Sequence, residues 1–229
     1  MTRRLARHLD LPPGARVLDV ASGRGVSAVL LAQEYGLQVT GVDLSAANIA
    51  LARGRADSEG LADRVTFTVG DAERLPYPDA AFDAVVIECA LCTFPDKRAA
   101  AAEIARVLRP AGKLGLTDVV ADQSRLPAEL TTLAARIACI ADALPLHAYV
   151  ELLREAGLPA RHTERHDVAV IRMIDQIEAR LTVIRMTSPD RLEELGLDLD
   201  RAAPVLNAAR TAVGRGVLGY GLLIAAKRA

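Results

Sequence analysis

Residues 16–25 read RVLDVASGRG, a short apolar run followed by a turn of small residues and then by a helical stretch. The run is almost continuously apolar, as expected for a strand buried inside a parallel sheet. Small residues leave the backbone N–H groups of the turn unshielded, so a ligand can approach them closely. The stretch therefore predicts a strand, a cofactor-binding turn and a helix, although short glycine turns also serve as plain connections.

Outward from this stretch, short β-branched runs alternate with longer helical stretches rich in Ala and Leu. This alternation is typical of βαβ units wound around a mostly parallel sheet. Ser45 and Asp96 each precede a helical stretch and are suited to cap its N-terminus. Further strands are expected at 38–42, 65–69, 82–87 and 113–119, the last entered through a turn at 110–112, and helices at 24–35, 46–59 and 97–108.

The second half of the chain departs from this alternation. A helical insertion of roughly 40 residues separates two late strands, and insertions of that size usually cover a site. We expect a single domain over 1–229, with a cofactor-binding half at 1–120 and substrate-capping helices and the last strands at 121–229. The expected elements are helices at 127–141 and 146–156, a polar edge strand at 160–167, a short strand at 168–171 and a last strand at 217–226.

Composition argues against several classes of partner. The 28 basic and 29 acidic side chains nearly cancel, and no basic block is long enough to neutralise a nucleic-acid backbone. No run approaches the roughly 20 apolar residues of a membrane-spanning helix. Three cysteines in 229 residues make no disulfide framework, which favours a reducing compartment. We expect a cytoplasmic monomer or homodimer that acts on a small molecule, with no nucleic-acid or membrane partner.

Acidic side chains lie at the ends of the predicted strands. Asp19 is near the end of the first strand, Asp43 follows the second and Glu88 follows the fourth. An acidic residue at the end of the second strand can accept hydrogen bonds from both hydroxyls of a ribose. The turn at 70–72 ends the third strand and places Asp71 where it can meet the edge of an adenine.

Four motifs, VLDVASGRG, GVDLS, GDAERLPYPDAAFD and LRPAGKL, occur in this order over about 14–120. Together they resemble the motifs of class I S-adenosylmethionine-dependent methyltransferases of the small-molecule group, except that Ala21 and Ala111 stand where those motifs have glycine. The resemblance implies an α/β, Rossmann-like fold with a mostly parallel seven-stranded sheet flanked by helices and a helical cap before the last strand. It also implies S-adenosylmethionine as cofactor. The cofactor-binding residues that it implies are Asp19, Ala21, Ser22, Gly23, Gly25, Asp43, Leu44, Asp71, Ala72 and Glu88.

The cysteines carry a partial resemblance to arsenite methyltransferases. Cys139 lies in ACIADALPLHAYVELLREAGL, which is similar to the region around an arsenic-binding cysteine of that family. Cys89 and Cys92 lie just past the fourth strand, where this fold brings the acceptor close to the methyl group. Thiolates suit a thiophilic metalloid acceptor such as As(III). No cysteine precedes Cys89 or follows Cys139, and each of the three also fits the role of a small buried hydrophobe.

Other acceptors and other functions stay open at this point. An oxygen or nitrogen acceptor needs a proton acceptor nearby, and His147 and Glu88 are the candidates. The segment 23–28 also fits G-x-G-x-x-A, the dinucleotide fingerprint of NAD(P)-linked oxidoreductases. A family member that keeps the cofactor pocket without catalysis would serve as a regulatory or assembly module.

Overall fold

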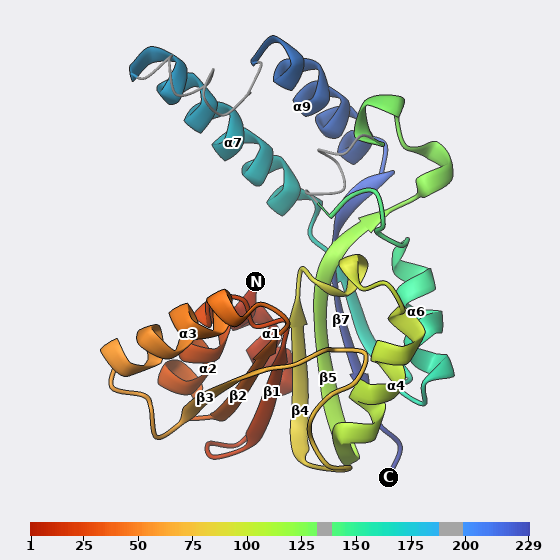
Figure 1. Cartoon of the computed structure of the whole chain (residues 1–229). Helices are drawn as coiled ribbons and strands as arrows, with labels where there is room; N and C mark the ends of the chain where they lie inside the picture. Colours follow the sequence, from red (N-terminus) through yellow and green to blue (C-terminus); the bar gives the residue numbers. More distant parts are fainter. Residues whose placement is uncertain (132–138, 188–198) are drawn as a thin grey trace. The chain divides into compact units, whose positions relative to one another are not determined.

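The computed structural model describes residues 1–131, 139–187 and 199–229, and the chain forms two compact units (Figure 1). The first unit contains the whole N-terminal half of the chain and two shorter segments from the C-terminal half. The single domain expected over residues 1–229 remains a prediction. Unit 1 is Met1–Asp118, Leu146–Glu164 and Leu222–Ala229, and unit 2 is Val119–Pro145 and Arg165–Gly221.

A seven-stranded sheet with the order β3-β2-β1-β4-β5-β7-β6 confirms the predicted α/β architecture. β1 pairs in parallel with both β2 and β4, β2 pairs in parallel with β3, and β4 with β5. The strand order reverses between β1 and β4, and open α/β sheets bind ligands beyond the carboxyl ends of the strands at such a point. The strands are β1 (Arg16–Val20), β2 (Gln38–Asp43), β3 (Val65–Val69), β4 (Phe82–Glu88), β5 (Leu108–Ala121), β6 (Ala160–Arg165) and β7 (Leu218–Ala226).

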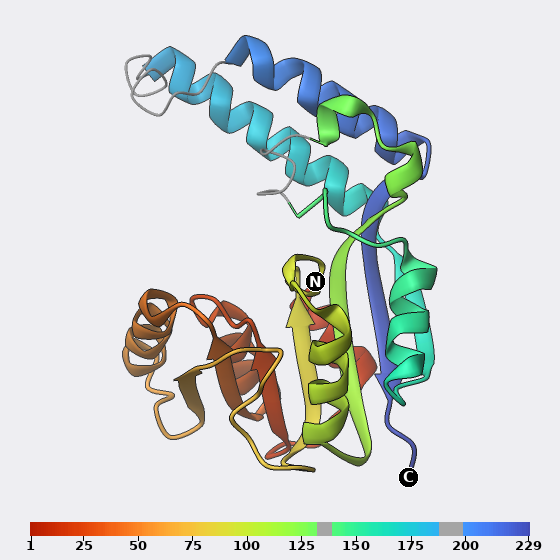
Figure 2. The same ribbon diagram turned by 45° about the vertical axis from the view of Figure 1, so that its right-hand side comes forward.

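Helices cover the sheet of the first unit. Buried side chains of the first three helices form one hydrophobic core with alternate residues of the strands, including Ala84 and Val86 of β4. Val85 and Ile87 point to the opposite face, because successive side chains of a strand alternate, and Figure 2 shows α4 lying across β4 and β5. The helices are α1 (Thr2–Leu9), α2 (Val26–Tyr35), α3 (Ala46–Ser58), α4 (Lys97–Val107) and α6 (Leu146–Glu155).

The predicted N-caps of two of these helices are confirmed. The Ser45 hydroxyl accepts a hydrogen bond from the backbone N–H of Asn48 at the start of α3. The Asp96 carboxylate accepts from the N–H groups of Arg98 and Ala99 at the start of α4. Both caps satisfy backbone donors that the helices themselves leave unpaired.

In the second unit, α7 (Asp167–Thr187) and α9 (Leu199–Gly214) pack along each other, side by side in both views (Figures 1 and 2). Arg210 of α9 forms ion pairs with Asp175 and Glu178 of α7, each with an N–O distance of 2.6 Å. These two helices lie between β6 and β7 in the chain, as predicted for the helical insertion. No helix among the described residues combines the length and the apolar character that crossing a membrane requires.

The strand expected at 168–171 is wrong, because these residues form the first turn of α7. A four-residue apolar run is too short for its periodicity to distinguish a strand from a helix. The polar edge strand expected just before it is confirmed as β6, which lies at one edge of the sheet. The helix expected at 127–141 lies partly outside the described residues, and the part that is described contains the short 3-10 helix Ala128–Leu130.

The start of the fifth strand also differs from the expectation. β5 begins at Leu108, so the turn expected at 110–112 lies within the strand. Phe82 of β4 pairs with Leu108 while Ala84 pairs with Lys113, which leaves the extra residues of β5 as a local irregularity. The sequence identified the interruption correctly but placed it before the strand, because a turn and a bulge use the same small residues.

Candidate functional site

The turn at 21–25 joins the carboxyl end of β1 to the start of α2. Its backbone adopts positive φ angles of 56° at Ala21, 52° at Gly23 and 74° at Gly25. Such angles are costly for residues that carry a Cβ, by roughly 1–2 kcal/mol. The alanine at position 21 therefore bears strain that the glycine of the family motif would avoid.

Gly25 is required at its position on two grounds. Its φ angle is positive, and a Cβ built there would lie 2.6 Å from Cζ of Phe67, a buried side chain of β3. The N–H of Gly25 donates to the carbonyl of Ser22 at 2.9 Å, and the N–H of Ser22 donates to the carbonyl of Val42 at 3.0 Å. The turn is therefore held against β2 and β3 without a ligand.

Asp43, at the end of β2, organises this turn with both carboxylate oxygens. Its Oδ2 accepts from the N–H of Gly23 at 2.8 Å, and its Oδ1 accepts from the N–H of Ser45 at 2.9 Å and from Nδ2 of Asn48 at 3.2 Å. A carboxylate offers about four acceptor positions. Three of them are occupied here, so Asp43 retains room for one more donor.

A cavity of ≈ 230 Å³ lies at the carboxyl ends of the first strands, entirely within the first unit. Asp43 lies on its wall, and Leu44 beside it exposes 75% of its surface. An exposed leucine next to a carboxylate provides an apolar surface and a polar anchor for one flat, hydroxylated ligand. The lining residues are Ala21, Val42, Asp43, Leu44, Gly70, Asp71, Ala72, Glu73, Thr93, Phe94 and Pro95.

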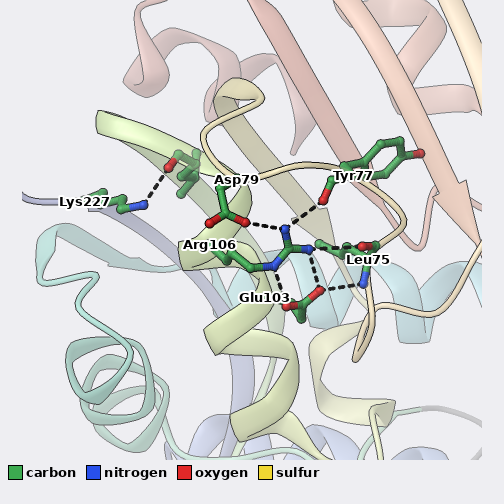
Figure 3. Close-up of polar contacts among 7 residues, drawn as sticks. Leu75, Tyr77, Asp79, Glu103, Arg106 and Lys227 are labelled. Atoms are coloured by element: carbon green, nitrogen blue, oxygen red, sulfur yellow. Dashed lines mark hydrogen bonds and ion pairs between the residues drawn. The ribbon is translucent and has the colours of Figure 1, made fainter.

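Arg106 of α4 holds the segment that carries one wall of this cavity (Figure 3). Its guanidinium donates to the carbonyls of Leu75 and Tyr77, at 3.1 and 2.8 Å, and to the carboxylates of Glu103 and Asp79. Glu103 in turn accepts from the N–H of Leu75 at 2.8 Å. Hydrogen bonds to Glu103 and then Asp79 raise the pKa of Arg106 above its ordinary value. The cation is thus a fixed anchor for the loop that follows β3.

Three buried oxygens close to the turn have no hydrogen-bond partner among the described residues: Oδ2 of Asp19, Oγ of Ser22 and Oε1 of Glu88. Asp19 exposes only 2% of its surface. Burial, and then the nearby carboxylate of Glu88, raise the pKa of Asp19 well above its ordinary value. The other oxygen of Glu88, Oε2, accepts from the Thr2 hydroxyl at 3.1 Å. Buried acceptors without donors are costly, and a ligand group that is cationic and donates hydrogen bonds could supply the missing donors.

Cys89 and Cys92 lie on the turn that follows β4. Cys89 has a φ angle of 56° and donates its N–H to the carbonyl of Thr117 at 2.7 Å, and Cys92 donates its N–H to Oδ2 of the buried Asp118 at 2.9 Å. Cys89 is exposed and Cys92 is buried. The turn is therefore held against β5 by backbone donors and carries two thiols in different environments.

The other two candidate residues lie apart from this turn in the chain. His147 is exposed in the first turn of α6, in the first unit. Cys139 belongs to the second unit and has a φ angle of 62°. The structure thus brings Cys89 and Cys92 onto one turn and assigns Cys139 to the other unit.

Residues 18–116 match the model of a family described as a methyltransferase domain. Residues 18–116 of the chain therefore carry a methyltransferase domain. This domain accounts for the mostly parallel sheet, for the turn after β1 and for an acidic residue at the end of β2, all of which the sequence predicts. The dinucleotide fingerprint at 23–28 is therefore a by-product of the methyltransferase turn.

Relatives of known name support the same assignment. The chain is 38% identical to 27-O-demethylrifamycin SV methyltransferase of Amycolatopsis mediterranei over 168 residues, which cover 72% of this chain and 61% of that protein. The fold is similar to that of a solved putative sarcosine dimethylglycine methyltransferase from Galdieria sulphuraria, with a TM-score of 0.85, 23% identity and coverage of 99% and 84% of the two chains. It is also similar to the solved [4+2]-cyclase SpnF, with a TM-score of 0.74, 29% identity and coverage of 99% and 80%. The chain spans between 43% and 61% of the length of the first three curated relatives that it matches.

Several residues that shape the domain's site were missed by sequence reasoning. Asn48 and Thr2 bind the carboxylates of Asp43 and Glu88, and Arg106 anchors the loop after β3. Thr2 and Arg106 lie far in the sequence from the groups they contact, and no local signal marks them. Asn48 was within reach, because it is the third residue of the helix that Ser45 caps, and a polar side chain there can reach back toward the N-cap.

Proposed function

We propose that this chain is an S-adenosylmethionine-dependent methyltransferase that acts on a small molecule. The observation that carries the proposal is the set of buried oxygens of Asp19, Ser22 and Glu88 without donors, next to the cavity that Asp43 lines. The cofactor's ammonium group supplies the missing donors, and its sulfonium supplies a second positive charge close to the two carboxylates. The residues present therefore fit this cofactor in charge and in hydrogen-bonding capacity.

Each part of the cofactor has a matching part of the site in this proposal. Asp43 binds a ribose hydroxyl with its remaining acceptor position, Leu44 packs on the adenine, and Asp71 meets the adenine edge. The methionine part lies over the turn at 21–25, with its ammonium between Asp19 and Glu88. The proposed cofactor-binding residues are Asp19, Ala21, Ser22, Gly23, Gly25, Asp43, Leu44, Asp71, Ala72 and Glu88.

The cofactor, when bound, supplies a methyl group activated by its bond to a positively charged sulfur. Displacement at that carbon requires an acceptor atom held in line with the sulfur, so the residues of the chain act mainly by positioning and by excluding water. The turn with Cys89 and Cys92 bounds the acceptor side of this arrangement. A hydroxyl acceptor also needs a proton acceptor, for which His147 and Glu88 are the candidates.

We favour a hydroxyl group of a small organic molecule as the acceptor. The curated relative described above, which matches 72% of this chain, is named 27-O-demethylrifamycin SV methyltransferase, a name that points to methylation of an oxygen. Arsenite would need several thiolates converging on one atom. Cys92 is buried, Cys139 belongs to the other unit, and the named relatives give arsenite no support. Arsenite therefore enters the test as one acceptor of a panel.

Binding of the cofactor product is the first test. Titration calorimetry with S-adenosylhomocysteine should give one site per chain, and Asp43→Ala should weaken binding at least tenfold because it removes both the ribose contact and the order of the turn. Asp57→Ala, which alters an exposed aspartate on α3, is the matched control and should bind as the wild type does. Binding of NADH with none of S-adenosylhomocysteine would overturn the proposal.

Methyl transfer is the second test. Incubation with methyl-labelled cofactor and a panel of phenols, macrolactone alcohols, amines, thiols and arsenite should label a hydroxyl-bearing acceptor. Cys89→Ser, Cys92→Ser, Cys139→Ser and His147→Ala then separate the acceptor classes, since arsenite turnover requires the thiols and hydroxyl turnover does not. A protein that binds the cofactor product but labels no acceptor would be a binding module or, like its structural neighbour SpnF, would catalyse a different reaction.

A further inference from the structure

A second cluster of chemically active side chains lies on the first unit, between α1 and the edge strand β6. His8 of α1 and His162 of β6 stack their imidazole rings, with centroids 4.4 Å apart and ring planes inclined by 23°. Both Nε2 atoms point at one oxygen of Glu164, at 3.0 Å from His8 and 2.7 Å from His162. The three ligand atoms lie within 4.8 Å of one another. The cofactor site makes no use of them.

We propose that His8, His162 and Glu164 form a binding site for a divalent transition-metal ion, with Zn²⁺ as the reference ligand. Two imidazoles and one carboxylate are the donor set that Zn²⁺ and Ni²⁺ accept readily. Tetrahedral zinc places its ligand atoms about 3.3 Å apart, given bond lengths of about 2.0 Å. The observed separations from the Glu164 oxygen are a few tenths of an ångström shorter, and the stacked rings must turn toward each other for both Nε2 lone pairs to face one ion.

The convergence of these side chains is built by the fold and not by one flexible loop. Leu5 and Leu9 of α1 are buried in the hydrophobic core, which fixes the helix face that carries His8. His162 and Glu164 are separated by two positions on β6, so their side chains lie on the same face of the strand. A Zn²⁺ ion bound by these two histidines and one carboxylate oxygen would keep its remaining coordination positions open to water.

Arg4 is the group that a metal ion would have to compete with. It binds Glu164 through two contacts, Nε to Oε2 at 2.5 Å and Nη2 to Oε1 at 2.8 Å. Only the second contact involves the oxygen that the histidines share. Arg4 therefore repels a cation at this site and lowers its affinity, while the oxygen Oε2 can keep its contact with Arg4. Replacing Arg4 with a neutral residue should therefore strengthen metal binding. Side chains that only form hydrogen bonds with one another would not give this result.

Calorimetric titration of the untagged, chelator-treated chain with Zn²⁺ and with Ni²⁺ tests the site. We expect one ion per chain, and at least a tenfold loss of affinity in each of His8→Ala, His162→Ala and Glu164→Gln. His147→Ala removes an exposed histidine elsewhere in the same unit and is the matched control, which should keep wild-type affinity. Arg4→Gln should increase affinity at least threefold.

The same ion should stabilise the fold, since it joins the first helix to an edge strand. At Zn²⁺ concentrations about a hundredfold above Kd, the melting temperature should rise by about 5 °C, and the His8→Ala/His162→Ala double variant should show no such rise. If the double variant melts too early to compare, Glu164→Gln serves in its place. Zn²⁺ binding that is absent from the wild type, or equal in the wild type and the double variant, overturns the proposal.

Discussion

Replacing Asp19 by Asn should make the chain more stable on its own and poorer at binding its cofactor. Asp19 is buried, and its Oδ2 has no donor among the described residues, while a second carboxylate, Glu88, raises its pKa further. Asn keeps the shape of the side chain and can still accept the hydrogen bond from the backbone N–H of Ala28. Its amide group removes the buried charge and can donate toward Glu88.

The size of both effects follows from these contacts. A buried acceptor without a partner costs about 1–3 kcal/mol. Asp19→Asn should therefore raise the free energy of unfolding by about that amount, or the melting temperature by roughly 2–10 °C for a chain of this length. Loss of the charge-assisted hydrogen bond to the cofactor's ammonium group should cost about 1.5–3 kcal/mol, which weakens binding by roughly tenfold to 150-fold.

The stability difference between the two proteins should also depend on pH. Because the pKa of Asp19 is raised, the folded chain holds this proton more tightly than the unfolded chain does. The contribution of Asp19 to the free energy of unfolding therefore decreases as pH rises from the ordinary value of 3.8 through the raised value. Glu34 and Glu103, whose arginine partners lower their pKa, contribute with the opposite sign. Their contributions are common to both proteins and cancel in the difference.

Urea unfolding of wild type and Asp19→Asn between pH 4 and 8, without cofactor, measures the first effect, and calorimetry with S-adenosylhomocysteine measures the second. Asp57→Asn, at an exposed position, is the control for replacing any aspartate. The advantage of Asp19→Asn over the wild type should grow with pH. A variant that is less stable than the wild type at pH 7, or that binds S-adenosylhomocysteine equally well, would refute the reasoning that this carboxylate is kept for the cofactor.

Three further substitutions test strained or anchoring positions of the first unit. Ala111→Gly should stabilise the chain by about 0.5–1 kcal/mol, because φ is 60° there and relief of that strain exceeds the entropy cost of glycine; urea unfolding measures it, and a loss of stability would contradict it. Gly25→Ala should cost at least about 2 kcal/mol and abolish binding of S-adenosylhomocysteine, since its Cβ would lie 2.6 Å from the ring of Phe67; retained affinity in calorimetry would show that the turn adapts. Arg106→Met should lower the free energy of unfolding by about 2 kcal/mol and weaken S-adenosylhomocysteine about tenfold through the loosened loop, as followed by the same two assays, and unchanged affinity would show that the wall does not need this anchor.

Local signals made much of the fold predictable. Each of the first four strands is a short apolar run at the predicted place, and Ser45 and Asp96 cap the helices predicted to follow them. The positions of Asp19 and Asp43 at strand ends were also predictable, because the apolar run that predicts each strand also shows where that strand ends. Side chains at adjacent strand ends must meet at one edge of the sheet.

Features that depend on distant contacts were not predictable in this way. Residues 168–171 look like a strand, yet they begin α7, where Val170 and Ile174, four positions apart, are both buried. Three hydrogen bonds of Arg106 connect α4 to a loop some thirty residues earlier, and an arginine on a helix carries no mark of such a role. His8 and His162, whose rings stack, are separated in sequence by most of the chain, so only the folded structure shows that they meet.

Two strained backbone positions of the first unit coincide with its buried carboxylate oxygens that have no donor among the described residues, and a bound cofactor would explain why. Val20 of β1 pairs in register with Ile87 of β4, close to the ends of both strands. Shortly after each of these residues the chain turns through a non-glycine residue with positive φ, which is Ala21 after β1 and Cys89 after β4. The oxygens of Asp19 and Glu88 without donors lie at these same strand ends. Strain and unpaired buried charge each reduce stability, so a chain selected for stability alone would lose them. Their coincidence at the carboxyl edge, between the two strands where the sheet order reverses, is what we expect of a site for a cofactor that carries an ammonium and a sulfonium group.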